Sequence, residues 1–165
     1  MNARTSLFAA ALAAAASLGL PNQADAAVMN RVFVGNATAY CQSALPVFDA
    51  RIRKRPLAVQ NDGSTSAYVT CSFPGQFEAI TGITINFASD SPASLTCTGV
   101  SGTGGAPARY SVKSVDLVNN WQYALTWEPY DFADTSIIFF SVSCNLPPGV
   151  GIQDSYISFT EDVGQ

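Results

Sequence analysis

The residues with the clearest chemistry are the four cysteines, Cys41, Cys71, Cys97 and Cys144. They are widely separated and form no Cys-x-x-Cys pair, so their spacing favours neither a zinc site nor a thioredoxin-type redox site. An even number of cysteines in an oxidising compartment predicts structural disulfides. Four cysteines allow three pairings, of which we favour Cys41–Cys71 together with Cys97–Cys144.

Histidine is absent from the 165 residues. Catalytic triads, Cys-His dyads and metal sites that depend on imidazole are therefore excluded. Glu128, Asp131 and Asp134 offer carboxylates to a Ca²⁺ ion but match no EF-hand spacing, so a solvated loop is favoured. No carboxylate pair is distinguishable from surface charge, as a glycosidase would require. We expect a protein that is not an enzyme, with no catalytic residues, no cofactor and no metal.

The only run of charge is the segment Arg51-Ile52-Arg53-Lys54-Arg55, in a chain whose net charge is −4. An extended backbone would place Arg51, Arg53 and Arg55 on one face, where they could contact an anionic cell-surface component. Pro56 marks an edge strand, and charges on an edge also prevent aggregation. We favour the guarded, solvated edge, with surface binding by Arg51, Arg53, Lys54 and Arg55 as the alternative.

Aromatic residues are densest around Trp121, Tyr123 and Trp127, which are separated by even steps and would share one face of a continuous strand. Exposed on a flat sheet, these rings could stack on sugars. Leu125 is in phase with Tyr123 and Trp127, and this favours a core face in which the aromatic rings are buried. Core packing is our preferred interpretation, and sugar stacking is the alternative.

Residues 1–26 have the three parts of a secretory signal peptide. Arg4 supplies the positive start, an uncharged apolar run covers residues 6–20, and Ala24-Asp25-Ala26 is a cleavage motif after Pro21. The run is shorter than the ~20 residues that span a bilayer. We expect cleavage after Ala26 and a secreted or periplasmic protein whose mature chain has no transmembrane segment.

Short β-prone runs separated by turn clusters dominate residues 27–165, with almost no helical signal. Predicted strands cover residues 56–60, 66–73, 80–88, 93–100, 109–118, 122–127, 136–144 and 152–160. The alternation in Ile83-Thr84-Ile85-Asn86-Phe87 is typical of an antiparallel sheet with one buried face. We therefore predict a single all-β domain, an antiparallel β-sandwich of about eight strands, with a closed β-barrel as the alternative.

The charge composition limits the classes of binding partner that the sequence supports. Charged residues make up 12% of the chain, about half of the roughly 25% usual in globular proteins. A sequence pI near 4.5 argues against nucleic acid as a partner. We expect an exported, non-catalytic structural or interaction module. A carbohydrate-binding module with a glycan or cell-surface partner is the alternative, and a hydrolase ranks last.

Several short segments of the chain are similar to segments of a known group of proteins. They include Cys41-Gln42-Ser43, Val69-Thr70-Cys71 and Cys144-Asn145-Leu146. The full set covers residues 41–46, 52–58, 69–71, 144–149, 152–156 and 161–164. These segments resemble an uncharacterised group of small secreted proteins from Gram-negative bacteria. The resemblance implies an exported, β-rich domain with paired cysteines. It implies no reaction, and it carries no functional residue over to this chain.

Overall fold

The computed structural model describes residues 27–75, 79–102, 107–118 and 122–164. Residues 28–161 form one compact unit, and Ala27 with residues 162–164 belongs to a second. Within the second unit, the Val163 amide donates a hydrogen bond to the Ala27 carbonyl at 3.0 Å. The predicted signal segment, residues 1–26, and Trp121 lie outside the described residues.

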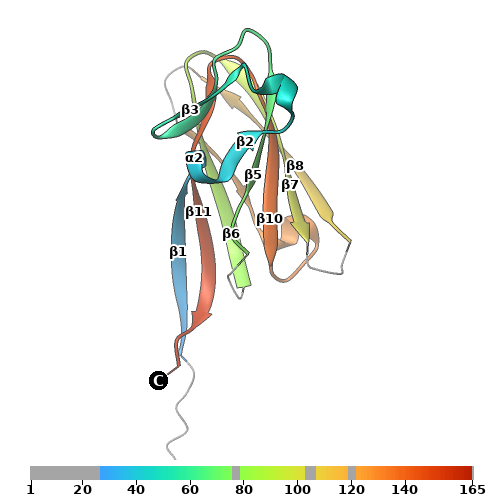
Figure 1. Cartoon of the computed structure of the whole chain (residues 1–165). Coiled ribbons are helices and arrows are strands. Elements are labelled where there is room, and N and C mark those ends of the chain that lie inside the picture. The colour runs from blue at the N-terminus through green and yellow to red at the C-terminus, as the bar shows by residue number, and fades with distance from the viewer. Residues whose placement is uncertain (1–26, 76–78, 103–106, 119–121, 165) are drawn as a thin grey trace, which may run out of the picture. The chain divides into compact units, whose positions relative to one another are not determined.

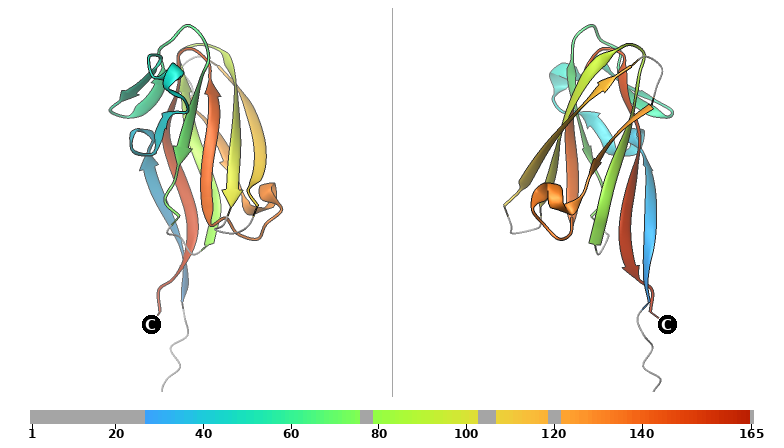
Figure 2. Two further views of the ribbon diagram at one scale, coloured as in Figure 1. Left: turned by 45° about the vertical axis from the view of Figure 1, so that its right-hand side comes forward. Right: turned by 180° about the vertical axis from the view of Figure 1, so that it is seen from behind.

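The described strands form two antiparallel sheets packed face to face (Figures 1 and 2). Sheet A has the order β3-β4-β11-β6-β9, with β1 also pairing with β11. Its strands are β1 (Val28–Asn36), β3 (Ile52–Arg55), β4 (Ala58–Asn61), β6 (Ala79–Ser89), β9 (Gln122–Trp127) and β11 (Val150–Asp162). Sheet B has the order β2-β5-β10-β7-β8. Its strands are β2 (Cys41–Ser43), β5 (Ala67–Ser72), β7 (Ala93–Gly102), β8 (Arg109–Leu117) and β10 (Phe139–Leu146).

This arrangement confirms the predicted β-sandwich, because the described strands form two sheets and do not close into a barrel. Each of the eight predicted segments contains or overlaps a strand of the structure. The predicted strands missed β1, β2 and β3, the last of which the sequence treated only as a charged edge segment before Pro56. The sequence patterns also missed three short helices, namely α2 (Ala37–Tyr40), η1 (Pro46–Phe48) and η2 (Pro129–Phe132).

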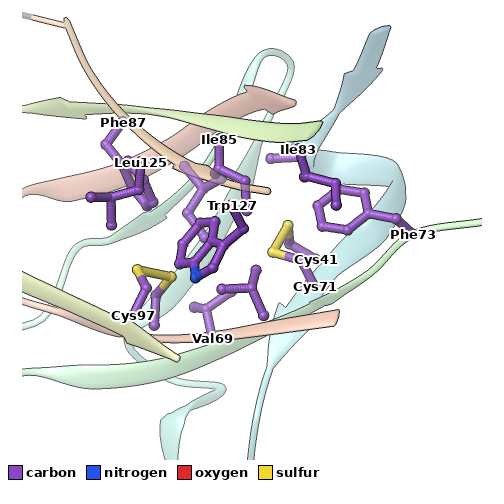
Figure 3. Close-up of a cluster of buried hydrophobic side chains, with 14 of the residues drawn as sticks. Cys41, Val69, Cys71, Phe73, Ile83, Ile85, Phe87, Cys97, Leu125 and Trp127 are labelled. Atoms are coloured by element: carbon purple, nitrogen blue, oxygen red, sulfur yellow. A yellow bond between two sulfur atoms is a disulfide. The ribbon is translucent and has the colours of Figure 1, made fainter. Parts of the chain in front are cut away.

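The core lies between the sheets and is built from the alternate residues of each strand. Ile83, Ile85 and Phe87 on β6 are fully buried, whereas the residues between them are partly exposed. Trp127 extends from β9 into the centre of this cluster, near both disulfides (Figure 3). Burial of a large aromatic side chain such as Phe or Trp contributes about 1.5–3 kcal/mol or more, so this face of sheet A carries much of the stability.

Both predicted disulfides are present, and the predicted pairing is confirmed. Cys41 on β2 bonds to Cys71 on β5, and Cys97 on β7 bonds to Cys144 on β10. In each case the bonded cysteines are directly opposite each other in the register of sheet B. All four side chains are buried in the core, in phase with apolar neighbours such as Val69 and Leu95.

Candidate functional site

Trp127 does not belong to the exposed aromatic face that was the alternative interpretation of β9. Trp127 is 0% exposed, and its indole Nε1–H donates to the Ser111 carbonyl oxygen at 3.2 Å. Tyr123 is half-buried against the core, and its hydroxyl accepts the Val118 amide hydrogen at 2.7 Å. Sugar stacking on Trp127 is therefore wrong, because its alternation with Leu125 and Tyr123 directs these side chains inward. The preferred core packing is confirmed for Trp127.

The basic segment lies where the sequence placed it, on the outermost described strand of sheet A beyond β4. Its cations differ in their contacts. Arg55 pairs with Asp62 at 2.8 Å, and Arg51 donates to the Ser66 carbonyl at 3.3 Å. Lys54 donates to the Thr38 carbonyl at 3.1 Å. The edge strand is confirmed, and binding to an anionic surface stays a prediction.

Polar side chains from distant parts of the chain meet instead on the outer face of sheet A. They line a groove of about 190 Å³, which we call the amide groove. Its lining residues are Asn36, Leu57, Gln122, Gln153 and Asp154. The volume lies below the roughly 300–1,000 Å³ of pockets that enclose drug-sized ligands, so the groove suits one part of an extended ligand.

A β-bulge in β11 creates the centre of the amide groove. The register with β6 shifts between Ile152 and Asp154, so Gln153 is the extra residue. Ile152 is buried, and Asp154 takes the outward position opposite Asn86, whose side-chain amide donates to the Asp154 carboxylate at 2.6 Å. Bulges commonly redirect side chains in this way next to functional sites.

The outer strand β9 supplies the opposite wall. The Gln122 side-chain amide donates to the Gln153 side-chain oxygen at 3.0 Å. Ala88 on β6 lies opposite Gln122 in the register, and its small side chain lets the two glutamines meet above it. The amides are therefore held by each other before any ligand binds, which lowers the entropy cost of binding.

Asn36 and Leu57 close the other side of the amide groove. The Asn36 side-chain oxygen caps α2 by accepting from the Thr38 amide at 2.9 Å, and its amide nitrogen donates to the Pro56 carbonyl at 3.5 Å. These contacts connect the end of β1 to the β3–β4 hairpin, which Figure 1 shows at the same end of β1 as α2. Leu57 at the hairpin turn is 74% exposed and gives this wall an apolar surface.

Tyr156 extends the same face along β11. It lies two residues after Asp154, is opposite Thr84 in the register and is 40% exposed. The neighbouring Ser155 points inward, where its hydroxyl contacts the Gly35 carbonyl at 3.4 Å, so Tyr156 must point outward. An aromatic ring is therefore available beside the polar groups of the amide groove.

A second, shallower depression of about 520 Å³ lies at the end of β4. Its lining includes the Arg55–Asp62 ion pair, Gln60 and Asp90. The Gln60 amide donates to the Asp90 carboxylate at 2.8 Å and to the Gly149 carbonyl at 3.2 Å. Its polar groups are therefore largely paired with one another.

The acidic residues after β9 have structural contacts. Asp131 accepts hydrogen bonds from the Glu128 amide and from the Lys113 ammonium, both at 2.8 Å. Glu128 in turn forms a reciprocal capping box with Asp131 at the start of η2. Asp134 accepts from the Thr135 amide at 2.8 Å.

None of the amide groove was predicted from the sequence. Asn36 ends a strand that the patterns missed. The alternation of apolar and polar residues in β11 does not indicate the bulge at Gln153. The one available signal was Gln122, which is out of phase with the aromatic residues of β9 and therefore belongs to the solvent face. Within the described residues, no helix is both long and apolar enough to span a bilayer.

The comparisons with known proteins identify no family. No family model and no curated protein matches the chain. Among solved structures, the C-terminal CBM6 of LamC, a marine laminarinase from Zobellia galactanivorans, matches at 12% identity and a TM-score of 0.47, covering 78% of this chain and 99% of that one. A CBM6 from Clostridium stercorarium in complex with cellobiose matches at 10% identity and a TM-score of 0.46, covering 76% and 92%.

A virus coat protein matches nearly as well. The coat protein of Tobacco streak virus has 11% identity and a TM-score of 0.41, covering 88% of this chain and 92% of its own. With all three TM-scores below 0.5, these similarities assign no ligand to this chain.

Proposed function

We propose that the protein is an exported, non-catalytic glycan-binding module whose ligand lies in the amide groove. The observation that carries the proposal is the convergence of Asn36, Gln122, Gln153 and Asp154 around one groove on a sheet face. Amides offer both donors and acceptors, and a carboxylate accepts strongly. Sugar hydroxyls need this mixture because each hydroxyl is both a donor and an acceptor.

Two apolar surfaces support a saccharide over a small polar metabolite. Leu57 lines the groove, Tyr156 lies two residues after Asp154 on β11, and both side chains are exposed. The C–H faces of a sugar ring pack on such surfaces while its hydroxyls reach the amides. This site replaces the aromatic face of β9 that the sequence suggested for sugar stacking.

The groove supports binding without cleavage. Asp154 is the one carboxylate among its lining residues, and it already accepts the Asn86 amide. Hydrolysis of a glycosidic bond ordinarily uses two carboxyl groups on opposite sides of the bond. The two disulfides support an oxidising compartment, as export would provide.

A glycan array probed with the purified, disulfide-bonded protein tests the proposal. Gln122→Ala and Gln153→Ala should each weaken binding to the best array ligand about fivefold, because each removes about 1 kcal/mol of net hydrogen bonding. Thr98→Ala, on the outer face of sheet B, is the matched control and should leave the affinity unchanged. An array without reproducible ligands, or equal loss in all three variants, would overturn the proposal.

One observation favours a second candidate, the protein-interaction module expected from the sequence. None of the other described strands pairs with the second edge of β1, on which Val28, Val32 and Val34 are more than half exposed. Long apolar edges add strands from other chains. Sedimentation velocity over a range of concentrations tests for self-pairing, and Val32→Lys should abolish any association that is observed.

A further inference from the structure

We propose that the glycan is acidic and that Arg53 binds its anionic group. This inference rests on the proposed glycan-binding function and names the class of ligand for the same sheet face. Its basis is the position of Arg53 in the register of sheet A, together with the contacts of the neighbouring cations.

Arg53 lies in a continuous row that crosses sheet A and reaches the amide groove. The row runs from Arg53 to Gln60, Gly151, Ala88 and Gln122, each opposite the next on the neighbouring strand. Residues directly opposite each other in a sheet point to the same face. Arg53 and Gln122 are therefore the two ends of one row on the face that carries the amide groove.

The residues in the middle of this row have small side chains or none. Gly151 has no side chain, and Ala88 has only a methyl group. A Cβ at position 151 would lie 3.3 Å from the Gln60 Cβ, so a larger residue would crowd the row. The Gln60 side chain is itself turned to Asp90 and Gly149. An extended ligand can therefore lie across the strands, over a span of roughly four strand spacings of ~4.8 Å each.

Arg53 is the exposed cation of this face for which the described residues provide no hydrogen-bond partner, whereas Arg51 donates to the Ser66 carbonyl. Arg55, which shares the face, donates to both carboxylate oxygens of Asp62, at 3.0 and 2.8 Å. Lys54 is opposite the buried Val59 and therefore points to the other side of the hairpin, where it contacts Thr38. Arg53 is exposed, and no acceptor for it is found among the described residues.

The chemistry of a guanidinium specifies the ligand group. Its fixed fork of donors matches a carboxylate or a sulfate with two parallel hydrogen bonds. The other end of the row has the opposite character, because Asp154 beside Gln153 repels anions and accepts hydroxyl hydrogens. The ligand should thus carry its acidic sugar at the β3 edge and an unsubstituted sugar in the amide groove.

The test uses Arg53→Gln and a glycan array with matched neutral, uronate and sulfated oligosaccharides. Arg53→Gln should weaken binding to the acidic members about fivefold at low salt, and high salt should reduce the difference, because an exposed charge pair contributes little and is screened. Binding to neutral members should not change. Lys54→Gln is the matched control, since it removes an adjacent charge from the opposite face.

The outcomes separate this inference from the proposed function. Dependence on Arg53 for either the uronate or the sulfated set supports the inference and identifies the anionic group. Binding that depends on Gln122 and Gln153 but not on Arg53 overturns the acidic ligand and leaves the glycan-binding function standing. A preference of the wild-type protein for the neutral members overturns it as well. Absence of all glycan binding overturns both.

Discussion

Trp127 of sheet A lies directly against Gly99 of sheet B. A Cβ at position 99 would lie 2.6 Å from the indole Nε1, closer than any packed side chain tolerates. Gly99 is opposite Ser111 in the register, and Ser111 is the residue whose carbonyl accepts the indole hydrogen. The missing side chain at Gly99 therefore opens the path by which Trp127 reaches sheet B.

Gly99→Ala should lower the free energy of unfolding by about 1–3 kcal/mol, because the added methyl group overpacks the core and displaces the indole. Gly82→Ala on β6 is the matched control, since its Cβ would have only the Trp127 carbonyl oxygen nearby, at 3.9 Å. Urea denaturation of both variants gives the comparison. Equal stability of the two variants would show that the contact with Trp127 is not restrictive.

The fluorescence of Trp127 should be inaccessible to ionic quenchers. The chain has two tryptophans, so Trp121→Phe leaves Trp127 as the single reporter. Its full burial predicts a quenching constant for iodide close to zero in the folded protein. The same variant in denaturant should be quenched readily and serves as the control. Efficient quenching in the folded state would contradict the packing described for β9.

Asn61 should be more important for stability than its neighbour Gln60. Asn61 is 0% exposed, and its side-chain nitrogen donates to the Leu146 and Thr65 carbonyls at 2.8 and 2.9 Å. Asn61→Ala removes the partner of the buried Leu146 carbonyl and the bond to the exposed Thr65, and should cost about 1–3 kcal/mol. Gln60→Ala, in a solvated depression, should cost less than about 1 kcal/mol. Thermal melts of both variants measure the two losses of stability. Equal losses would contradict this prediction.

Removal of the Cys97–Cys144 disulfide should lower the free energy of unfolding by about 2–5 kcal/mol. The double variant Cys97→Ala/Cys144→Ala tests this by urea denaturation, with the intact Cys41–Cys71 bond as an internal reference.

Peptide mapping of the wild-type protein without reductant should recover only the two disulfide pairs of the structure. A peptide that joins Cys71 to Cys144, on neighbouring strands β5 and β10, would contradict the pairing.

The alternation of buried and exposed residues was sufficient to predict the sandwich and most of its strands. It succeeded where a strand has one buried face, as in Ile83 to Phe87. It failed for β1, because most of its side chains are exposed and apolar residues such as Val32 and Val34 lie on the solvent face. Such a strand has no amphipathic signal, and only pairing with β11 makes it a strand.

The candidate site depends on information that is not local. Gln122 and Gln153 meet across an intervening strand, and a sequence pattern cannot report which residues of distant strands become neighbours. The edge position of Arg53 agrees with the guarded edge expected beside Pro56, but the edge strand is Ile52–Arg55 and Pro56 lies in the turn after it. The place of Arg53 in one row with Gln122 follows only from the register of five strands.

The pairing of β1 with β11 has a consequence for the order of folding. These are the first and last described strands, so sheet A is incomplete until both have been synthesised and have paired. The contacts between them span nearly the whole chain, and closing such loops slows folding. The pairing of β1 with β11 should therefore be among the last contacts to form, after the strands between them have assembled.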